Sequence, residues 1–264
     1  MVRDMVEHDK PLAYVLGSQP FHPLPVDLVV RAPILVPRPE TEHWVLHLSE
    51  TILSTATLAN DRPFRILDLG TGTGCIALGL TQSLVTSNRF PSVSTLAIDQ
   101  SNEAVTLARE NVERCKLEPS VQVVKLDLFD SDFAHRVVDD REGGHQRFNL
   151  VVSNPPYITR TEFESLDPSV KNWEDRAALV GERPSSTTGS DLDDGLIFYH
   201  KIASMLDDLL VPGRDELGPG PHVAFEVGKG QARAVETLLS ERGFKSEIVS
   251  DPWGIERAVF AWKL

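Results

Sequence analysis

The chain has 264 residues, a formal charge of −13 at pH 7 and a pI near 5.0. This acidic balance argues against a strong electrostatic grip on nucleic acid and suits a basic protein partner better. No apolar run approaches the roughly 18 residues that cross a bilayer, so we expect no membrane association. Two well-separated cysteines, Cys75 and Cys115, indicate reduced thiols in an intracellular protein.

Residues 1–36 contain five prolines among short extended runs such as Ala13–Leu16, a pattern that predicts a hairpin or strand-rich lead-in. The segment 37–42 then reads Pro-Arg-Pro-Glu-Thr-Glu, which places proline and carboxylates where a helix begins. We expect this helix to run from about Pro39 to the mid-fifties. His43 and His47 share a face of it, but without a third ligand they do not predict a metal site.

The rest of the chain alternates between apolar runs and helical patterns, which is typical of βαβ units and a mostly parallel sheet. Strands are expected at 65–69, 95–98, 121–126, 149–152, 222–227, 246–249 and 258–262. Helices are expected at 75–84, 101–115, 195–210 and 231–242. We predict surface loops at 139–147 and 212–221, and a disordered insertion at 183–191.

A glycine-rich turn joins the first of these strands to the first helix. It reads Gly70-Thr71-Gly72-Thr73-Gly74, and a turn of this kind lets a ligand approach the backbone closely. The dinucleotide fingerprint requires glycine or alanine where Cys75 stands, which weakens a nicotinamide interpretation. With Asp68 in the preceding strand, the turn instead resembles the first motif of S-adenosylmethionine-dependent methyltransferases.

Carboxylates also end the next two strands. Asp99 closes the second strand, where it could accept both ribose hydroxyls of a nucleoside cofactor, or simply cap the following helix. Asp127 ends the third strand within reach of an adenine amino group, and Leu128 could cover the adenine face. Polar groups at the ends of three successive strands together favour a nucleoside site.

The run Ser153-Asn154-Pro155-Pro156-Tyr157 follows a fourth, buried strand. Two prolines force the backbone out of the sheet there, and a rigid loop exit is the simplest interpretation. Ligands of open α/β folds, however, bind at this edge. The Asn154 side-chain oxygen and the Pro155 carbonyl could accept both N–H groups of a planar amine, and Tyr157 could stack on it. Catalysis would then rest on positioning and an activated cofactor, without a metal or a covalent nucleophile.

Together these motifs resemble the HemK/PrmC family of N5-glutamine methyltransferases, which modify peptide-chain release factors. The resemblance covers almost the whole chain and rests on the stretches 11–17, 36–42, 68–74, 153–158, 176–179, 194–199, 225–228 and 254–257. It implies a Rossmann-like α/β fold with a mostly parallel seven-stranded sheet, an antiparallel last strand and helices on both faces. It also implies S-adenosylmethionine as cofactor and the glutamine of a Gly-Gly-Gln loop as target.

The resemblance assigns roles to specific residues. Asn154, Pro155 and Tyr157 are expected to be catalytic, and Pro156, Arg38 and Glu40 to join them in contacting substrate. The expected cofactor-binding residues are Asp68, Gly70, Thr71, Gly72, Thr73, Gly74, Asp99, Asp127, Leu128 and Asn154.

The chain departs from the family pattern in two ways. Only about a dozen residues precede the Ala13–Gly17 stretch, where the family usually has a helical docking domain, and Leu128 stands where an aromatic side chain often lies. We therefore expect a lead-in and linker helix at 1–50 and a catalytic domain at 51–264. We expect a monomer and a mitochondrial location, with the cytoplasm as the alternative.

Two other functions use the same motifs. An amino-group methyltransferase acting on DNA or RNA shares the Asn-Pro-Pro-Tyr chemistry, but the negative charge disfavours it, as does the lack of a recognisable target-recognition domain. A partner module that binds the cofactor only structurally is the third hypothesis, and intact motifs at both sites count against it.

Overall fold

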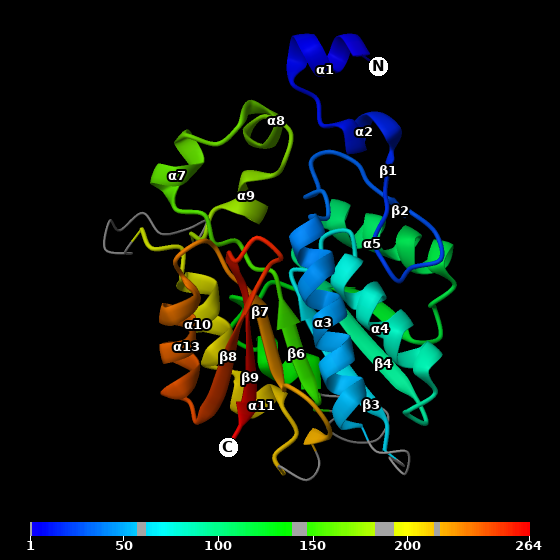
Figure 1. Cartoon of the computed structure of the whole chain (residues 1–264), viewed down its shortest axis with the longest axis vertical. Coiled ribbons are helices and arrows are strands. Elements are labelled where there is room, and N and C mark those ends of the chain that lie inside the picture. Colours follow the sequence, from blue (N-terminus) through cyan, green and yellow to red (C-terminus); the bar gives the residue numbers. More distant parts are fainter. Residues whose placement is uncertain (1, 57–61, 139–146, 183–192, 214–216) are drawn as a thin grey trace.

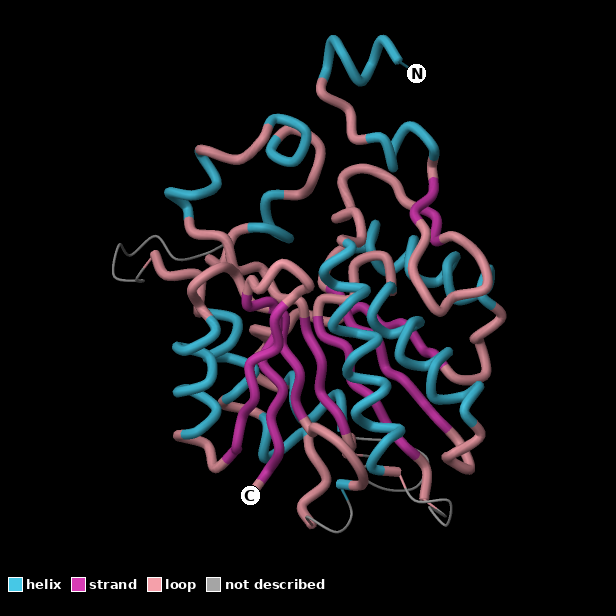
Figure 2. Tube along the Cα trace, viewed as in Figure 1, coloured by secondary structure: helices cyan, strands magenta, loops and turns pink. Residues whose placement is uncertain are grey.

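The computed structural model describes residues 2–56, 62–138, 147–182, 193–213 and 217–264. Its centre is a seven-stranded sheet in the order β5-β4-β3-β6-β7-β9-β8 (Figures 1 and 2). The strands are β3 (Phe64–Leu69), β4 (Val93–Asp99), β5 (Val121–Lys125), β6 (Leu150–Ser153), β7 (Val223–Glu226), β8 (Phe244–Ser250) and β9 (Glu256–Lys263).

The pairing confirms the predicted fold class. Strands β3 to β7 pair in parallel with one another. Strand β9, the last in the chain, runs antiparallel to both β7 and β8. All seven predicted strands are present, with ends that differ by a few residues.

Successive residues of a strand point to opposite faces of the sheet. Both faces of this sheet carry apolar side chains, and helices cover both. In β3, Ile66 joins one apolar cluster with Leu78, while Leu67 joins another with Tyr199. The first face carries α3 (Pro39–Thr55), α4 (Cys75–Ser87) and α5 (Asn102–Cys115). The second carries α6 (Phe133–Val138), α10 (Ile197–Ala203), α11 (Leu206–Leu209) and α13 (Ala232–Ser240).

The lead-in is only partly the hairpin that the sequence predicts. Strands β1 (Ser18–Gln19) and β2 (Leu28–Val29) do form an antiparallel pair. Before them lie helices α1 (Val2–His8) and α2 (Leu12–Leu16), so the extended conformation expected for Ala13–Leu16 is wrong. Tyr14 of α2 donates a hydrogen bond to the Ile34 carbonyl (2.7 Å), a non-local contact that a strand propensity cannot anticipate.

The segment after β6 contains three short helices that the sequence analysis missed: α7 (Arg160–Glu164), α8 (Pro168–Lys171) and α9 (Arg176–Leu179). Each begins at a capping side chain, namely Thr159, Asp167 and Asp175. The single helix expected at 195–210 is instead two helices, α10 and α11. The insertion predicted at 183–191 lies outside the described residues, as does all of the 139–147 loop except residue 147.

A buried asparagine ties the lead-in to the sheet. Asn111 of α5 donates from Nδ2 to the carbonyls of Val29 (3.1 Å) and Thr73 (2.9 Å), and its Oδ1 accepts from the Val29 amide (2.8 Å). One side chain therefore holds β2 against the glycine turn. The predicted division at residue 50 stays a prediction, because α3 spans it. No helix within the described ranges is long and apolar enough to cross a membrane.

We predict that Asn111→Ala lowers the free energy of unfolding by about 2–4 kcal/mol, because three backbone groups lose their partner in a buried place. Denaturant unfolding of the purified protein measures this change. The exposed Asn172 provides the control, since Asn172→Ala should change stability by less than about 0.5 kcal/mol. Equal effects of the two substitutions would contradict the assigned role of Asn111.

Candidate functional site

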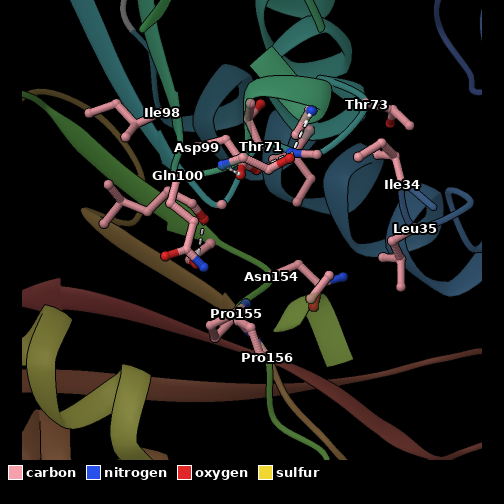
Figure 3. Close-up of a pocket in the computed structure, with 18 of the residues that line it drawn as sticks. Ile34, Leu35, Thr71, Thr73, Ile98, Asp99, Gln100, Asn154, Pro155 and Pro156 are labelled. Atoms are coloured by element: carbon pink, nitrogen blue, oxygen red, sulfur yellow. Dashed lines mark hydrogen bonds between the residues drawn. The ribbon is translucent and has the colours of Figure 1, made fainter. Parts of the chain in front are cut away.

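A cavity opens at the carboxyl edge of the sheet, where the loops after β3, β4, β5 and β6 meet (Figure 3). Ten residues predicted from sequence line it: Gly70, Thr71, Gly72, Thr73, Asp99, Asp127, Leu128, Asn154, Pro155 and Pro156. Five others that were predicted do not line it: Asp68, Gly74, Tyr157, Arg38 and Glu40. The parallel pairing explains this convergence, because it brings the ends of distant strands to one edge.

The glycine turn takes a conformation that side chains resist. Gly70, Gly72 and Gly74 all have positive φ values, of 75°, 56° and 86°. The amides of Gly70 and Thr71 both donate to the Ile98 carbonyl at 2.9 Å, which fixes the turn against β4. The backbone of the turn therefore lies open along the cavity wall.

Asp99 holds the turn from the neighbouring strand. Its Oδ2 accepts from the Gly72 amide and its Oδ1 from the Ser101 amide, each at 2.9 Å. Burial raises the pKa of Asp99, and these amides oppose the shift by stabilising the carboxylate. Each carboxylate oxygen keeps a further lone pair for a ligand hydroxyl.

Asp68 lies beneath the turn and is fully buried. The Thr71 hydroxyl donates to its Oδ2 at 2.7 Å, whereas Oδ1 has no hydrogen-bond partner in the described part of the chain. Burial raises the pKa of Asp68 to about 7, against the opposing effect of the Thr71 hydroxyl. A buried carboxylate oxygen without a partner is costly and is suited to a bound cation.

The apolar part of the cavity includes residues that sequence reasoning missed. Leu128 lines it as predicted, and Phe198 of α10 lies there too, with its ring edge-on to Phe129 at 5.2 Å between centroids. An aromatic side chain thus reaches the cavity from a part of the sequence far from Leu128. On another side, the lead-in contributes Ile34 and Leu35 (Figure 3). No local motif marks these residues, since only the tertiary fold brings them together.

Asn154 follows β6 directly. Ser153 anchors the end of that strand by donating from its hydroxyl to the Leu69 carbonyl at 2.7 Å. The Asn154 side chain is partly exposed in the cavity and makes no hydrogen bond to any residue that the structure describes (Figure 3). Its amide is therefore available to a ligand.

The backbone after Asn154 is enclosed by close contacts. A Cβ atom at Gly195 would collide with the Tyr157 carbonyl, and one at Gly181 would lie 2.9 Å from the Pro156 oxygen. Gln231 then fixes the loop by donating from Nε2 to the Tyr157 carbonyl at 2.9 Å. We call Gly181, Gly195, Gly228 and Gln231 the loop cradle. The three glycines are required at these positions, because the neighbouring atoms leave no room for a Cβ atom.

Tyr157 does not line the cavity, and its hydroxyl approaches Glu226, a buried carboxylate of β7. The Tyr157 hydroxyl lies 3.4 Å from Glu226 Oε1, while Oε2 accepts from Thr41 (2.6 Å) and from Trp44 Nε1 (2.8 Å) of α3. Burial raises the pKa of Glu226, and these donors oppose that shift. The structure thus assigns the Tyr157 hydroxyl a contact within the protein, and the predicted stacking on a target stays a prediction.

Arg38 and Glu40 also pair within the protein. Arg38 Nη2 lies 2.6 Å from a carboxylate oxygen of the buried Glu174, and Glu40 lies 3.6 Å from Arg257. These ion pairs join the start of α3 to the segment after β6 and to β9. Contact of Arg38 or Glu40 with substrate remains a prediction. His47, considered above for a metal, stacks on Phe260 instead, with 5.8 Å between ring centroids.

Comparisons with known proteins agree with this geometry. The family model described as methyltransferase small domain matches residues 49–166. The release factor glutamine methyltransferase of Geobacter sulfurreducens is 36% identical over 252 residues, which is 95% of this chain and 72% of that protein. A protein of the same name from Fusobacterium nucleatum is 33% identical, over 96% of this chain and 60% of its own length.

Among solved structures, the hMettl16 catalytic domain in complex with MAT2A 3'UTR hairpin 6 superposes with a TM-score of 0.53 at 18% identity. The match covers 91% of this chain and 75% of that one, and it concerns the fold alone. The two relatives named above are bacterial, so the expected mitochondrial type gains no support from them. With 36% identity along nearly its whole length to the Geobacter protein, the chain belongs to the release factor glutamine methyltransferase family.

Proposed function

We propose that this protein transfers a methyl group from S-adenosylmethionine to the side-chain nitrogen of the glutamine in a release factor's Gly-Gly-Gln loop. The observation that carries the proposal is the Asn154 amide, which has no hydrogen-bond partner among the described residues and lies in the same cavity as the glycine turn and Asp99. Family membership supports the choice of target, because the Geobacter and Fusobacterium relatives are named for it.

The residues of the cavity fit S-adenosylmethionine. The cofactor carries a positive sulfonium and an ammonium group. The buried carboxylate of Asp68, whose Oδ1 has no hydrogen-bond partner among the described residues, supplies a negative charge beneath the turn. Asp99 offers lone pairs to ribose hydroxyls, while Leu128 and Phe198 offer apolar contact to a base. The bound cofactor supplies an activated methyl group. A nicotinamide cofactor is a poorer fit, since Cys75 occupies the position that its fingerprint reserves for a small residue.

Asn154 and Pro155 would position the target. The lone pair of an amide nitrogen is delocalised, so this nitrogen is a weak nucleophile until its orientation is fixed. The Asn154 side-chain oxygen and the Pro155 carbonyl accept its two N–H groups, and the loop cradle holds both acceptors in place. The proton displaced from the nitrogen leaves to solvent after transfer, so a strong base is not required. Positioning is then the main contribution of the protein.

Methylation of an amino group in DNA or RNA is the alternative, and the geometry around Asn154 would accommodate it. The charge of −13 disfavours it, because phosphates would be repelled rather than held. Monomeric assembly is part of our proposal. A mitochondrial location stays a prediction without support from the relatives above.

We predict that Asn154→Ala lowers methyl transfer to a Gly-Gly-Gln release factor by about 100-fold or more, since one of two acceptors for the target nitrogen is lost. Binding of S-adenosylmethionine, measured by calorimetry, should change by less than about threefold. Transfer is followed with labelled cofactor.

The assay includes DNA, RNA and a no-substrate control. Label in nucleic acid but not in the release factor would overturn the proposed function. Collapse of cofactor affinity in Asn154→Ala would instead place Asn154 in the cofactor site.

The loop cradle provides a second prediction with a closely matched control. Gly195 and Gly230 have similar positive φ values, of 70° and 85°, but only Gly195 lies against the Tyr157 backbone. Gly195→Ala should therefore reduce transfer by at least about tenfold through displacement of the loop. Gly230→Ala carries the same backbone strain without a contact and should keep nearly full activity. Equal losses in both variants would show that strain, not loop position, is responsible.

Asp68 gives the site a pH dependence. Its pKa is raised to about 7 in the free protein, and a bound cation lowers the pKa of a neighbouring carboxyl. Cofactor binding is then linked to loss of a proton, so affinity should fall as pH drops below 7, by about fivefold between pH 7 and pH 6. Calorimetry across this range measures the effect. The dependence should be much weaker in Asp68→Asn, and a profile unchanged by that substitution would assign the titration to another group.

A further inference from the structure

One aromatic side chain faces solvent, and it stands in the turn between β8 and β9. Trp253 is 74% exposed. Every phenylalanine, tyrosine and tryptophan of the chain lies within the described residues, and all of them except Trp253 are buried or half-buried. Tryptophan, with tyrosine and arginine, is enriched among the residues that dominate protein–protein binding energy. A single exposed side chain does not by itself indicate a binding site. The rigidity of the turn that carries Trp253, and the position of this turn relative to the cavity, provide the further support.

The turn that carries Trp253 is held rigidly by Asp251, which is buried. Its Oδ1 accepts from the amides of Trp253 (2.9 Å) and Ile255 (3.0 Å). Its Oδ2 accepts from Arg257 Nε at 2.9 Å, so both oxygens are used. The backbone beneath the indole is thus ordered before any partner arrives, which reduces the entropy lost on binding.

The strand register puts this turn at the edge that carries Asn154. Ser153 pairs with Phe225 of β7, and the next residue of β7, Glu226, pairs with Ala258 near the start of β9. The Val227 amide also donates to the Arg257 carbonyl at 2.9 Å. In Figure 1 the red β8–β9 turn lies at the end of the sheet where the green segment after β6 leaves it.

The charges around the β8–β9 turn favour a protein partner over nucleic acid. Arg257 already pairs with Asp251 and lies 3.6 Å from Glu40, so its charge is compensated within the protein. Glu40 and Glu256 are both partly exposed beside it. Carboxylates beside Arg257, on a chain of charge −13, repel phosphates and favour a basic or apolar protein surface.

We propose that Trp253 is a docking anchor for the body of the release factor, outside the glutamine loop that enters the cavity. This inference rests on the proposed function, because a protein whose glutamine reaches Asn154 must cover this edge of the sheet. The indole buries its face on the partner while the Asp251 turn holds its backbone. Its contribution is to affinity for the whole protein substrate, not to the chemistry at the target nitrogen.

Kinetics with two substrates test the proposal. For Trp253→Ala, KM for the full-length release factor should rise about tenfold or more while kcat stays within about twofold. KM for a short peptide containing Gly-Gly-Gln, and the affinity for S-adenosylmethionine, should not change. Trp253→Phe should recover much of the loss. Leu264→Ala is the matched control, since Leu264 is 71% exposed and follows β9 at the opposite edge of the sheet.

Any of the following results would overturn the proposal. The first is an unchanged KM for the release factor in Trp253→Ala, and the second is an equal rise in Leu264→Ala. The third is a parallel rise for the short peptide, which would give Trp253 a role in shaping the cavity. Calorimetric binding of the release factor to wild type and Trp253→Ala, without turnover, decides the matter even if the wild type methylates neither substrate. Loss of DNA or RNA binding in Trp253→Ala, with release-factor binding unchanged, would assign the anchor to nucleic acid.

Discussion

The pairing of β3 with β6 is the constraint on which the site depends. Leu69 lies opposite Ser153 in this parallel register, and the Ser153 hydroxyl donates to the Leu69 carbonyl. The next residues of the two strands are Gly70 and Asn154, so the glycine turn and the proline loop leave the sheet side by side. A Cβ placed on Gly70 would lie 3.9 Å from the Asn154 carbonyl oxygen. A slip of one residue would turn every side chain of β6 to the other face and separate the two loops.

Residues far apart in the sequence keep the proline loop in this position. The glycines of the loop cradle come from the segment after α9, the segment before α10 and the end of β7, and Gln231 precedes α13. The buried carboxylate of Glu226 adds a contact to the Tyr157 hydroxyl and two to α3. The loop cradle and Glu226 thus carry no reacting group, but both hold in place the backbone that presents Asn154 and Pro155.

Local patterns explain what the sequence could predict. The strands, the glycine turn and the carboxylates at strand ends are short-range signals, and parallel topology then places them at one edge. Helix α2 could not be predicted in this way, because Tyr14 and Val15 favour strands until the Tyr14 hydroxyl meets the Ile34 carbonyl. Phe198 and the contact between Gly195 and Tyr157 depend on packing between distant segments. The contact of Tyr157 could not be predicted either, since only the fold brings the Glu226 carboxylate to its hydroxyl.

In the proposed function, this cavity orients a glutamine side-chain amide for methylation. Fragmentation mass spectrometry of a release factor incubated with the protein and S-adenosylmethionine tests it most directly. One added methyl group is expected on the glutamine of the Gly-Gly-Gln loop, and none when that glutamine is replaced by alanine. A methyl group on any other residue, or on nucleic acid alone, would contradict it.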